Sequence, residues 1–339
     1  MQKYRMLVLT DHRGHSAENS IYSLLLALRN HPACESIAVA SRGNTFNHAF
    51  FKNHRDQHLF VSPVDASFGF YQDGRRFNHF MRRARVSDYD VILLRLPPPL
   101  TDSFWDFLTS SYPDHRIINR PSGIRETSSK AFLLQFPDLC PEMKLCRSVE
   151  DTLAFSNRFP VVLKPLRNYG GRGILRIEDG KVWEGNQYVQ LEDWLKGLAD
   201  QEVTFLGMRF LPNVSKGDKR IVVCNGEVLG ASLRLPPEGS WMCNAAQGGI
   251  PHAATLTPEE EHIARRLSPE LTRRGVVMFG FDTLTDDDGR RVLSEVNTVS
   301  IGGLAQMGRL SGQPVVRRAA ELIWKYTKTK IYGESNAIR

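Results

Sequence analysis

The chain has 339 residues, 41% hydrophobic and 24% charged, which is typical of a globular protein with two or three domains. No apolar run is long enough to cross a membrane and none near the N-terminus resembles a signal peptide, so we expect a cytoplasmic protein. The five cysteines are scattered without a C-x-x-C pair, which argues against disulfides and zinc. The net charge of +7 suits an enzyme with anionic substrates better than a nucleic-acid binder, because the densest basic run is only RRAR.

Strands and a helix alternate in the first part of the sequence. Leucines at helical spacing predict a helix over residues 19–31, which Ser20 could cap. Hydrophobic runs predict buried strands at residues 4–11, 36–41 and 88–96. This alternation predicts a doubly wound, parallel-sheet domain of the α/β class over residues 1–122. Residues 44–86 are polar and rich in aromatic residues, and they predict no clear element.

Further along the chain, the residue pattern changes to that of short strands separated by turns. Residues 122–136 predict a helix that starts near Thr127 or Ser128. Asp179-Gly180 and Asn225-Gly226 lie between β-prone runs, which is the strongest short signal of a hairpin. A second helix is predicted over residues 257–275, since Thr257 and Glu260 form a capping box and Gly275 ends the pattern.

The stretch FPVVLKPLRNYGGRGILRI, residues 159–177, predicts two strands around a glycine turn. Consecutive glycines let backbone N–H groups approach an anion, which indicates a phosphate site. Lys164, however, precedes Gly170 and Gly171, whereas a Walker A lysine follows its glycines and opens a helix. A hairpin tip with solvated arginines is the alternative.

A third hairpin carries the clearest site chemistry, in the run VVMFGFDTLTDDDGRRVLSEVNTVS. If Asp288 and Gly289 form a two-residue turn, Asp282 faces Glu295, and Asn297 lies on the same face. Two opposed carboxylates repel each other unless a cation lies between them, and oxygen ligands suit Mg²⁺ or Mn²⁺. A longer loop would shift the register and leave a solvated acidic pair.

Five motifs, in order, resemble those of bacterial glutathione synthetase, of the ATP-grasp superfamily. They are NRPSGIRETSSKAFLLQFP, VVLKPLRNYGGRGI, FLPNVSKGDKRIVVCNGEVLGASLRLPPEG, NAAQGGIPHAATLT and GFDTL followed by SEVNTVS. The resemblance implies that an ATP-grasp fold, of the α/β or α+β class, follows the N-terminal domain along the chain. The implied parts are a linker helix and lid subdomain at 123–202 and a catalytic subdomain at 203–328. From its own sequence, the tail at 329–339 is expected to fray.

The resemblance also assigns residues to ATP. Lys130 and Lys164 match the two lysines that contact the phosphates, and Asp218 matches the acid that holds the ribose. The glycine lid over the phosphates corresponds to Asn168, Gly170, Gly171 and Gly173. The inter-domain segment whose backbone meets adenine corresponds to Met208, Arg209, Phe210 and Leu211.

Around the transferring phosphate, Arg220 and Arg234 match two family arginines. Asn244, Gly248 and Gly249 match the second glycine-bearing loop, and Asp282, Glu295 and Asn297 match the metal ligands. The implied reaction joins a carboxylate to an amine through an acyl phosphate and releases ADP and phosphate, with two Mg²⁺ or Mn²⁺ ions and small-molecule substrates. Cations should outnumber acid–base residues, as phosphoryl transfer requires. Related ligases often form dimers or tetramers, so a homodimer or homotetramer is expected.

The sequence departs from the family where substrate should be recognised. Ile250 and Ala305 stand where family members commonly have arginines, although Arg95 or Arg309 could substitute for them. Glutathione synthesis from γ-glutamylcysteine and glycine is the leading hypothesis, and a sister ligase for another acid and amine is the alternative. A non-catalytic ATP-binding regulator is a more distant alternative, which the intact lysine and carboxylates disfavour.

Overall fold

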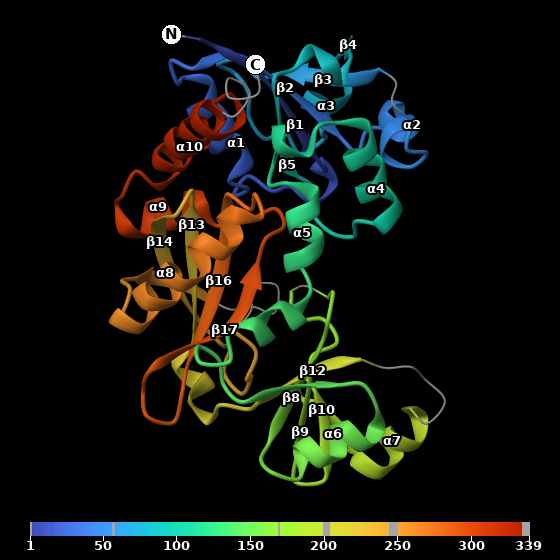
Figure 1. Ribbon diagram of the computed structural model, residues 1–339, viewed down its shortest axis with the longest axis vertical. Coiled ribbons are helices and arrows are strands. Elements are labelled where there is room, and N and C mark those ends of the chain that lie inside the picture. The colour runs from blue at the N-terminus through green and yellow to red at the C-terminus, as the bar shows by residue number, and fades with distance from the viewer. Residues whose placement is uncertain (1, 56–57, 169, 199–203, 244–249, 334–339) are drawn as a thin grey trace.

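Three β-sheets follow one another along the long axis of the molecule (Figure 1). The computed structural model describes residues 2–55, 58–168, 170–198, 204–243 and 250–333. The first sheet is built from residues 4–118, the second from 143–209 and the third from 218–297. The third sheet lies between the other two, so the chain runs to the far end of the molecule and then returns to its middle.

The first sheet has the order β4-β3-β2-β1-β5-β6. Its strands are β1 (Tyr4–Thr10), β2 (Cys34–Ser41), β3 (Leu59–Pro63), β4 (Arg82–Ala84), β5 (Val91–Arg95) and β6 (Ile117–Ile118). The pairs β1–β2, β1–β5 and β5–β6 are parallel, so the three predicted strands and their parallel pairing are confirmed. The segment 44–86, which predicted no element, supplies β3 and β4 as an antiparallel edge.

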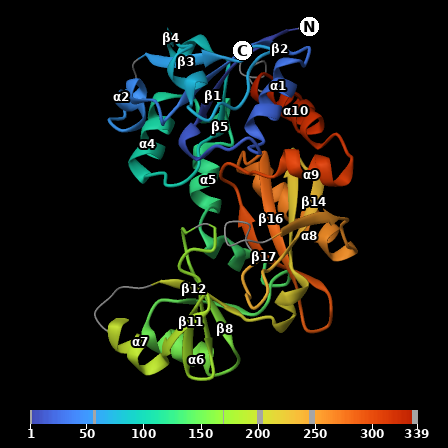
Figure 2. The same ribbon diagram turned by 180° about the vertical axis from the view of Figure 1, so that it is seen from behind.

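Helices cover both faces of this sheet, as a doubly wound domain requires. The helices of this region are α1 (Ile21–Arg29), α2 (His48–Phe51), α3 (Arg75–Asn78) and α4 (Asp102–Ser111). One face packs against α1 and against α10 (Val315–Tyr326), which lies beside α1 in both views although it comes from the far end of the chain (Figure 1, Figure 2). The other face packs against α2 and α4. Ser20 precedes α1 as predicted, but its hydroxyl accepts the Ala305 N–H at 3.0 Å instead of capping the helix.

The linker was expected to hold one helix over residues 122–136, and this prediction is wrong. The chain forms α5 (Pro121–Thr127) and then a separate 3-10 helix, Lys130–Gln135. Pro121 occupies the first turn of α5, where a missing N–H has no cost. The Ser129 hydroxyl accepts the Ala131 N–H at 3.3 Å, which starts the second helix in a new direction.

The second sheet is antiparallel throughout, in the order β11-β10-β9-β8-β12-β7. Its strands are β7 (Met143–Cys146), β8 (Val161–Pro165), β9 (Leu175–Glu178), β10 (Lys181–Glu184), β11 (Gln187–Gln190) and β12 (Phe205–Arg209). Helices α6 (Val149–Ser156) and α7 (Leu191–Leu198) accompany it. Asp179 and Gly180 have φ of +50° and +68° between β9 and β10, which confirms the predicted hairpin. The expected boundary at residue 203 falls before β12, a strand of this sheet.

The third sheet is also antiparallel, in the order β15-β14-β13-β16-β17. Its strands are β13 (Asp218–Cys224), β14 (Glu227–Leu235), β15 (Ile250–Ala254), β16 (Met278–Thr285) and β17 (Arg291–Asn297). Helices α8 (Pro258–Arg273) and α9 (Leu304–Ser311) pack on it. The Asn225-Gly226 hairpin and the capping box of Thr257 and Glu260 are both confirmed.

The tail was expected to fray from residue 329, but residues 327–331 form a π-helix that continues α10. Ile331 is buried, and the Tyr332 hydroxyl donates to the Asp90 carbonyl at 2.9 Å, so this segment is anchored on the first domain. Residues 334–339 lie outside the described part of the chain. None of the helices in the described ranges is long and apolar enough to span a membrane.

Candidate active site

The hairpin β16–β17 places the predicted metal ligands together. Asp282 pairs with Glu295 and Gly280 pairs with Asn297, as the two-residue turn predicted. The turn itself is different, because residues 286–290 form a longer loop closed by the Asp286 N–H on the Arg290 carbonyl at 2.9 Å. A β-bulge after Asp282 offsets this change and restores the predicted register at the site.

The bulge leaves Ser294 outside the ladder, and its carbonyl accepts a hydrogen bond from Lys164 Nζ at 2.9 Å. Lys164 lies in β8 of the second sheet, and its Nζ also lies 3.5 Å from Met208 Sδ. Burial lowers the pKa of Lys164, although Glu295 opposes this effect. The lysine therefore joins the second sheet to β17, the strand that carries Glu295.

Lys130, the other expected phosphate lysine, lies at the start of the 3-10 helix of the linker and is buried. Its Nζ lies 3.7 Å from Glu295 Oε1 and donates to the backbone carbonyl of Asn168. Its backbone N–H donates to the Leu166 carbonyl at 2.9 Å. The linker, the start of the glycine loop and β17 therefore meet at this side chain.

Two arginines and two aspartates form a buried network across β13, β14 and β16. Arg220 donates to both oxygens of Asp282, at 2.5 and 2.7 Å. Arg234 donates to both oxygens of Asp218, at 2.8 and 2.5 Å, and its guanidinium lies 3.1 Å from Asp282 Oδ2. Burial alone would raise the pKa of Asp282, but the two guanidinium groups lower it to about 2. The two arginines therefore favour the ionised form of Asp282.

Asp218 lines the candidate pocket, but its carboxylate is engaged by Arg234. Its pKa is raised by burial and by the charge of Asp282, an effect that Arg234 only partly offsets. The role expected for Asp218, to hold a ribose, stays a prediction.

The donor set fits a divalent metal ion. Asp282 and Glu295 face each other on one strand pair, and Asn297 follows Glu295 on the same face. The buried amide nitrogen of Asn297 has no hydrogen-bond partner among the described residues, and an amide there can present its oxygen to a cation. No cluster of three or more histidine, cysteine, aspartate or glutamate side chains suited to a metal occurs in the described ranges, so the fit depends on this asparagine.

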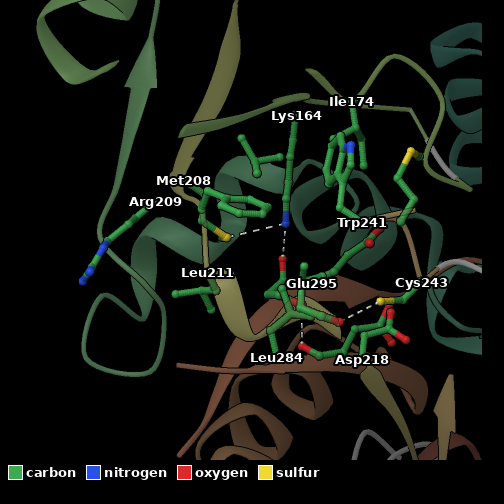
Figure 3. Close-up of a pocket in the computed structure, with 16 residues that line it drawn as sticks. Lys164, Ile174, Met208, Arg209, Leu211, Asp218, Trp241, Cys243, Leu284 and Glu295 are labelled. Carbon is green, nitrogen blue, oxygen red and sulfur yellow. Dashed lines mark hydrogen bonds between the residues drawn. The ribbon is translucent and has the colours of Figure 1, made fainter. Parts of the chain in front are cut away.

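A pocket lies between the second and third sheets, directly beside Lys164 and Glu295 (Figure 3). Met208, Phe210 and Leu211 of the expected adenine segment line one side of it. Arg209 also borders it, but its guanidinium points away and contacts Asp287 (Figure 3). The arginine side chain is thus directed away from the pocket, and the backbone N–H groups of Arg209 and Phe210 donate to the carbonyls of Glu142 and Pro160, both at 2.8 Å.

Sequence reasoning missed most of the apolar lining. The additional residues are Val162, Ile174, Val214, Trp241, Met242, Cys243 and Leu284. Val162 and Leu284 lie in the second and third sheets, and the others lie in the connections β8–β9, β12–β13 and β14–β15. Only the folded arrangement brings them together.

The glycine loop connects β8 to β9 beside this pocket. Gly170, Gly171 and Gly173 have φ of +69°, +77° and +69°, a backbone region that other residues rarely adopt. A Cβ on Gly173 would also lie 3.2 Å from Pro165 Cγ. The glycines are therefore required by the conformation of the loop.

Several predicted residues are not brought to the site by the described structure. Asn244, Gly248 and Gly249 lie outside the described residues. Ala305 lies in α9 against Ser20, and Arg309 pairs with Glu18 on the surface. Arg95 is buried, where it donates to the Ile301 carbonyl and lies 3.8 Å from Met278 Sδ, and burial lowers its pKa to about 10.

Comparison with known proteins agrees with this geometry. The family model of the prokaryotic glutathione synthetase ATP-grasp domain matches residues 129–312. A glutathione synthetase from Brucella melitensis biotype 1 is 32% identical over 246 residues, which span 71% of this chain and 74% of that protein.

Two solved structures share the fold. The D-cycloserine synthetase DcsG is 13% identical with a TM-score of 0.63, over 94% of this chain and 98% of that chain. A D-alanine–D-alanine ligase from Bacillus anthracis, complexed with ATP, is 13% identical with a TM-score of 0.56, over 97% and 99%. Strand pairing, site geometry and relatives agree, and the chain belongs to the prokaryotic glutathione synthetase family of ATP-grasp ligases.

Proposed function

We propose that this protein is an ATP-dependent ligase that joins γ-glutamylcysteine to glycine. The observation that carries the proposal is that Lys164 and the pair Asp282–Glu295 line one largely apolar pocket, with Lys130 Nζ 3.7 Å from Glu295 Oε1. An apolar pocket suits a purine base, and cations with oxygen ligands at its end suit a triphosphate with its metal. The family assignment supports the same reaction.

In the proposed reaction the substrate carboxylate attacks the γ-phosphorus of ATP, and the bond to the β-phosphate oxygen breaks to release ADP. The amine then attacks the acyl phosphate carbon and displaces inorganic phosphate. Lys164, Arg220 and Arg234 would offset the negative charge that develops on the transferring group. No side chain is assigned as general base, and the amine proton would leave to phosphate or water.

Asp282, Glu295 and Asn297 are proposed to hold the metal. ATP-grasp ligases use divalent metal ions in general, and for this chain we propose two ions, Mg²⁺ or Mn²⁺. When bound, such ions neutralise phosphate charge and orient the phosphate oxygens. Arg220 in the neighbouring strand β13 already donates to both Asp282 oxygens, so it fixes the orientation of this carboxylate.

The function is tested by ADP release from purified protein with ATP and Mg²⁺. We expect release only when γ-glutamylcysteine and glycine are both present, with glutathione as the product by mass spectrometry. If product formed only with a different acid–amine pair, and not with γ-glutamylcysteine and glycine, glutathione synthesis would be ruled out and the sister ligase favoured. A specific observation keeps that second candidate open, because Ile250 and Ala305 lack the cationic groups that a substrate with extra carboxylates needs.

The glycine loop is proposed to close over the phosphates and exclude water. Gly170→Val should lower kcat about tenfold or more with little change in nucleotide affinity, because valine disfavours a φ of +69° and hinders closure. Single-turnover kinetics and calorimetry of ADP binding separate the two effects. Equal rates for variant and parent protein would contradict a lid.

A cytoplasmic location and a homodimer or homotetramer are also proposed. Light scattering on the purified chain, with and without nucleotide, tests the assembly. A monomer under both conditions would contradict it.

A further inference from the structure

Arg176 lies in a box of three aromatic rings beside the nucleotide pocket. Its guanidinium carbon is 5.0 Å from the centre of the Phe210 ring, 5.3 Å from that of Trp183 and 5.6 Å from that of Trp241. Each distance is within the range of a cation–π interaction. The side chain is only 17% exposed, and its charge is met by Glu178, whose Oε2 lies 3.5 Å from Arg176 Nε.

The rings come from separate parts of the chain. Arg176 and Trp183 are cross-strand partners in the hairpin β9–β10 of the second sheet. Phe210 follows β12, and Trp241 lies in the connection between β14 and β15 of the third sheet. Trp241 is held a second time, since its Nε1 donates to the Gly185 carbonyl, just after β10, at 3.1 Å. One connection of the third sheet is therefore attached to a hairpin of the second.

Trp241 is also a wall of the pocket. It lies beside Ile174, across the pocket from Met208 and Leu211 (Figure 3). A flat aromatic ring at this place offers a stacking or edge surface to a purine base. Its position depends on Arg176, a residue outside the pocket lining, whose guanidinium lies among the rings of Trp241, Trp183 and Phe210.

We propose that Arg176 is a positioning residue for nucleotide, which holds Trp241 in place as the purine-facing wall and couples the β9–β10 hairpin to the third sheet. This inference rests on the proposed function, since it requires that the pocket bind ATP. Arg176 itself does not line that pocket. Its effect on the nucleotide would pass chiefly through Trp241, because Phe210, which also lines the pocket, is held separately by its backbone N–H, which donates to the Pro160 carbonyl at 2.8 Å.

The test measures the Kd of a non-hydrolysable ATP analogue by calorimetry. Arg176→Met keeps an aliphatic stem among the rings but removes the cation, so we expect a Kd about tenfold higher, with kcat at saturating ATP within about twofold of the parent. Lys181→Met is the matched control. Lys181 also places a cation over Trp183, at 5.9 Å, from the same hairpin, but it contacts neither Trp241 nor the pocket, and its loss should leave Kd unchanged.

A double-mutant cycle separates a positioning role from a general loss of structure. In a Trp241→Ala background, Arg176→Met should change Kd less than about twofold, because the residue through which it acts is gone. The fluorescence change that Trp241 shows on nucleotide binding, identified by its loss in Trp241→Phe, should shrink in Arg176→Met. A tenfold effect in both backgrounds, or none in either, would overturn the inference. If the parent protein binds no nucleotide, the proposed function fails first, and this inference fails with it.

Discussion

Glu295→Gln should lower kcat/KM about 10³-fold, equivalent to about 4 kcal/mol of transition-state stabilisation, while the fold stays intact. Glutamine keeps the size of the side chain but removes the charge that a divalent metal requires beside Asp282. Asp282 and Glu295 are directly opposed, so loss of one charge relieves a repulsion and offsets the lost ion pair between Glu295 and Lys130 at 3.7 Å; the melting temperature should not fall by more than a few degrees. Initial rates of ADP release and a thermal melt provide the two measurements.

Asp288→Asn is the control from the same hairpin. Asp288 lies in the loop between β16 and β17, where its side chain is 72% exposed and forms an ion pair with Arg290 at 2.6 Å. Its neutralisation should change kcat/KM by less than about twofold and the free energy of unfolding by less than about 0.5 kcal/mol. Binding of Mn²⁺ in the presence of ADP, followed by electron paramagnetic resonance, should weaken in Glu295→Gln and not in Asp288→Asn. Near-normal turnover of Glu295→Gln would show that Glu295 is not a metal ligand.

In the hairpin β16–β17, the residue pairing was predicted from the sequence but the turn was not. Asp282 was correctly paired with Glu295, but the premise of a two-residue turn was wrong. The loop 286–290 alone would place Ser294 opposite Asp282, and the bulge moves Glu295 into that position. Turn residues are readable from sequence, whereas a bulge depends on what the displaced residue can bind, here Lys164 from another sheet.

The pairing of Arg234 with Asp218 also depends on a β-bulge that the sequence did not predict. A two-residue Asn225-Gly226 turn alone would place Leu233 opposite Asp218. A second irregularity, between Val222 and Val223, shifts the register and places Arg234 there instead. The family resemblance assigned Asp218 and Arg234 to different parts of ATP, and it did not predict that they would bind each other. Ionic pairs of this kind are set by strand register, which local sequence determines only near the turn.

The elements with strong local signals were predicted well. The buried strands of the first sheet, the helix that follows Thr257 and the turns at Asp179-Gly180 and Asn225-Gly226 depend on short-range periodicity, capping and turn chemistry. The segment 44–86 was not predicted, because its short strands gain stability as an edge of the existing parallel sheet and not from their own pattern. The aromatic box around Arg176 was missed for a similar reason, since its members come from four segments.

Lys164→Met should abolish most of the activity without destabilising the protein. We expect kcat/KM to fall about 10²- to 10³-fold, as for the loss of one fixed donor to a developing charge. Methionine has a similar volume, so the buried space stays filled. The Ser294 carbonyl would lose its donor, at a cost of about 1–3 kcal/mol. The substitution also removes the desolvation penalty of a buried ammonium group, several kcal/mol, and this gain offsets that cost. The melting temperature should therefore stay within a few degrees of the parent or rise.

The lowered pKa of Lys164 gives this variant a second signature. A lysine whose pKa is lower in the folded than in the unfolded state binds fewer protons when folded, so it favours folding more as pH rises between those two pKa values. The free energy of unfolding of the parent should therefore rise with pH, relative to Lys164→Met, in alkaline solution. Lys144→Met is the control, because Lys144 lies in β7 of the same sheet but is 44% exposed and pairs with Asp151 at 2.7 Å. A large fall in melting temperature that accompanies the loss of activity would instead make Lys164 a structural residue.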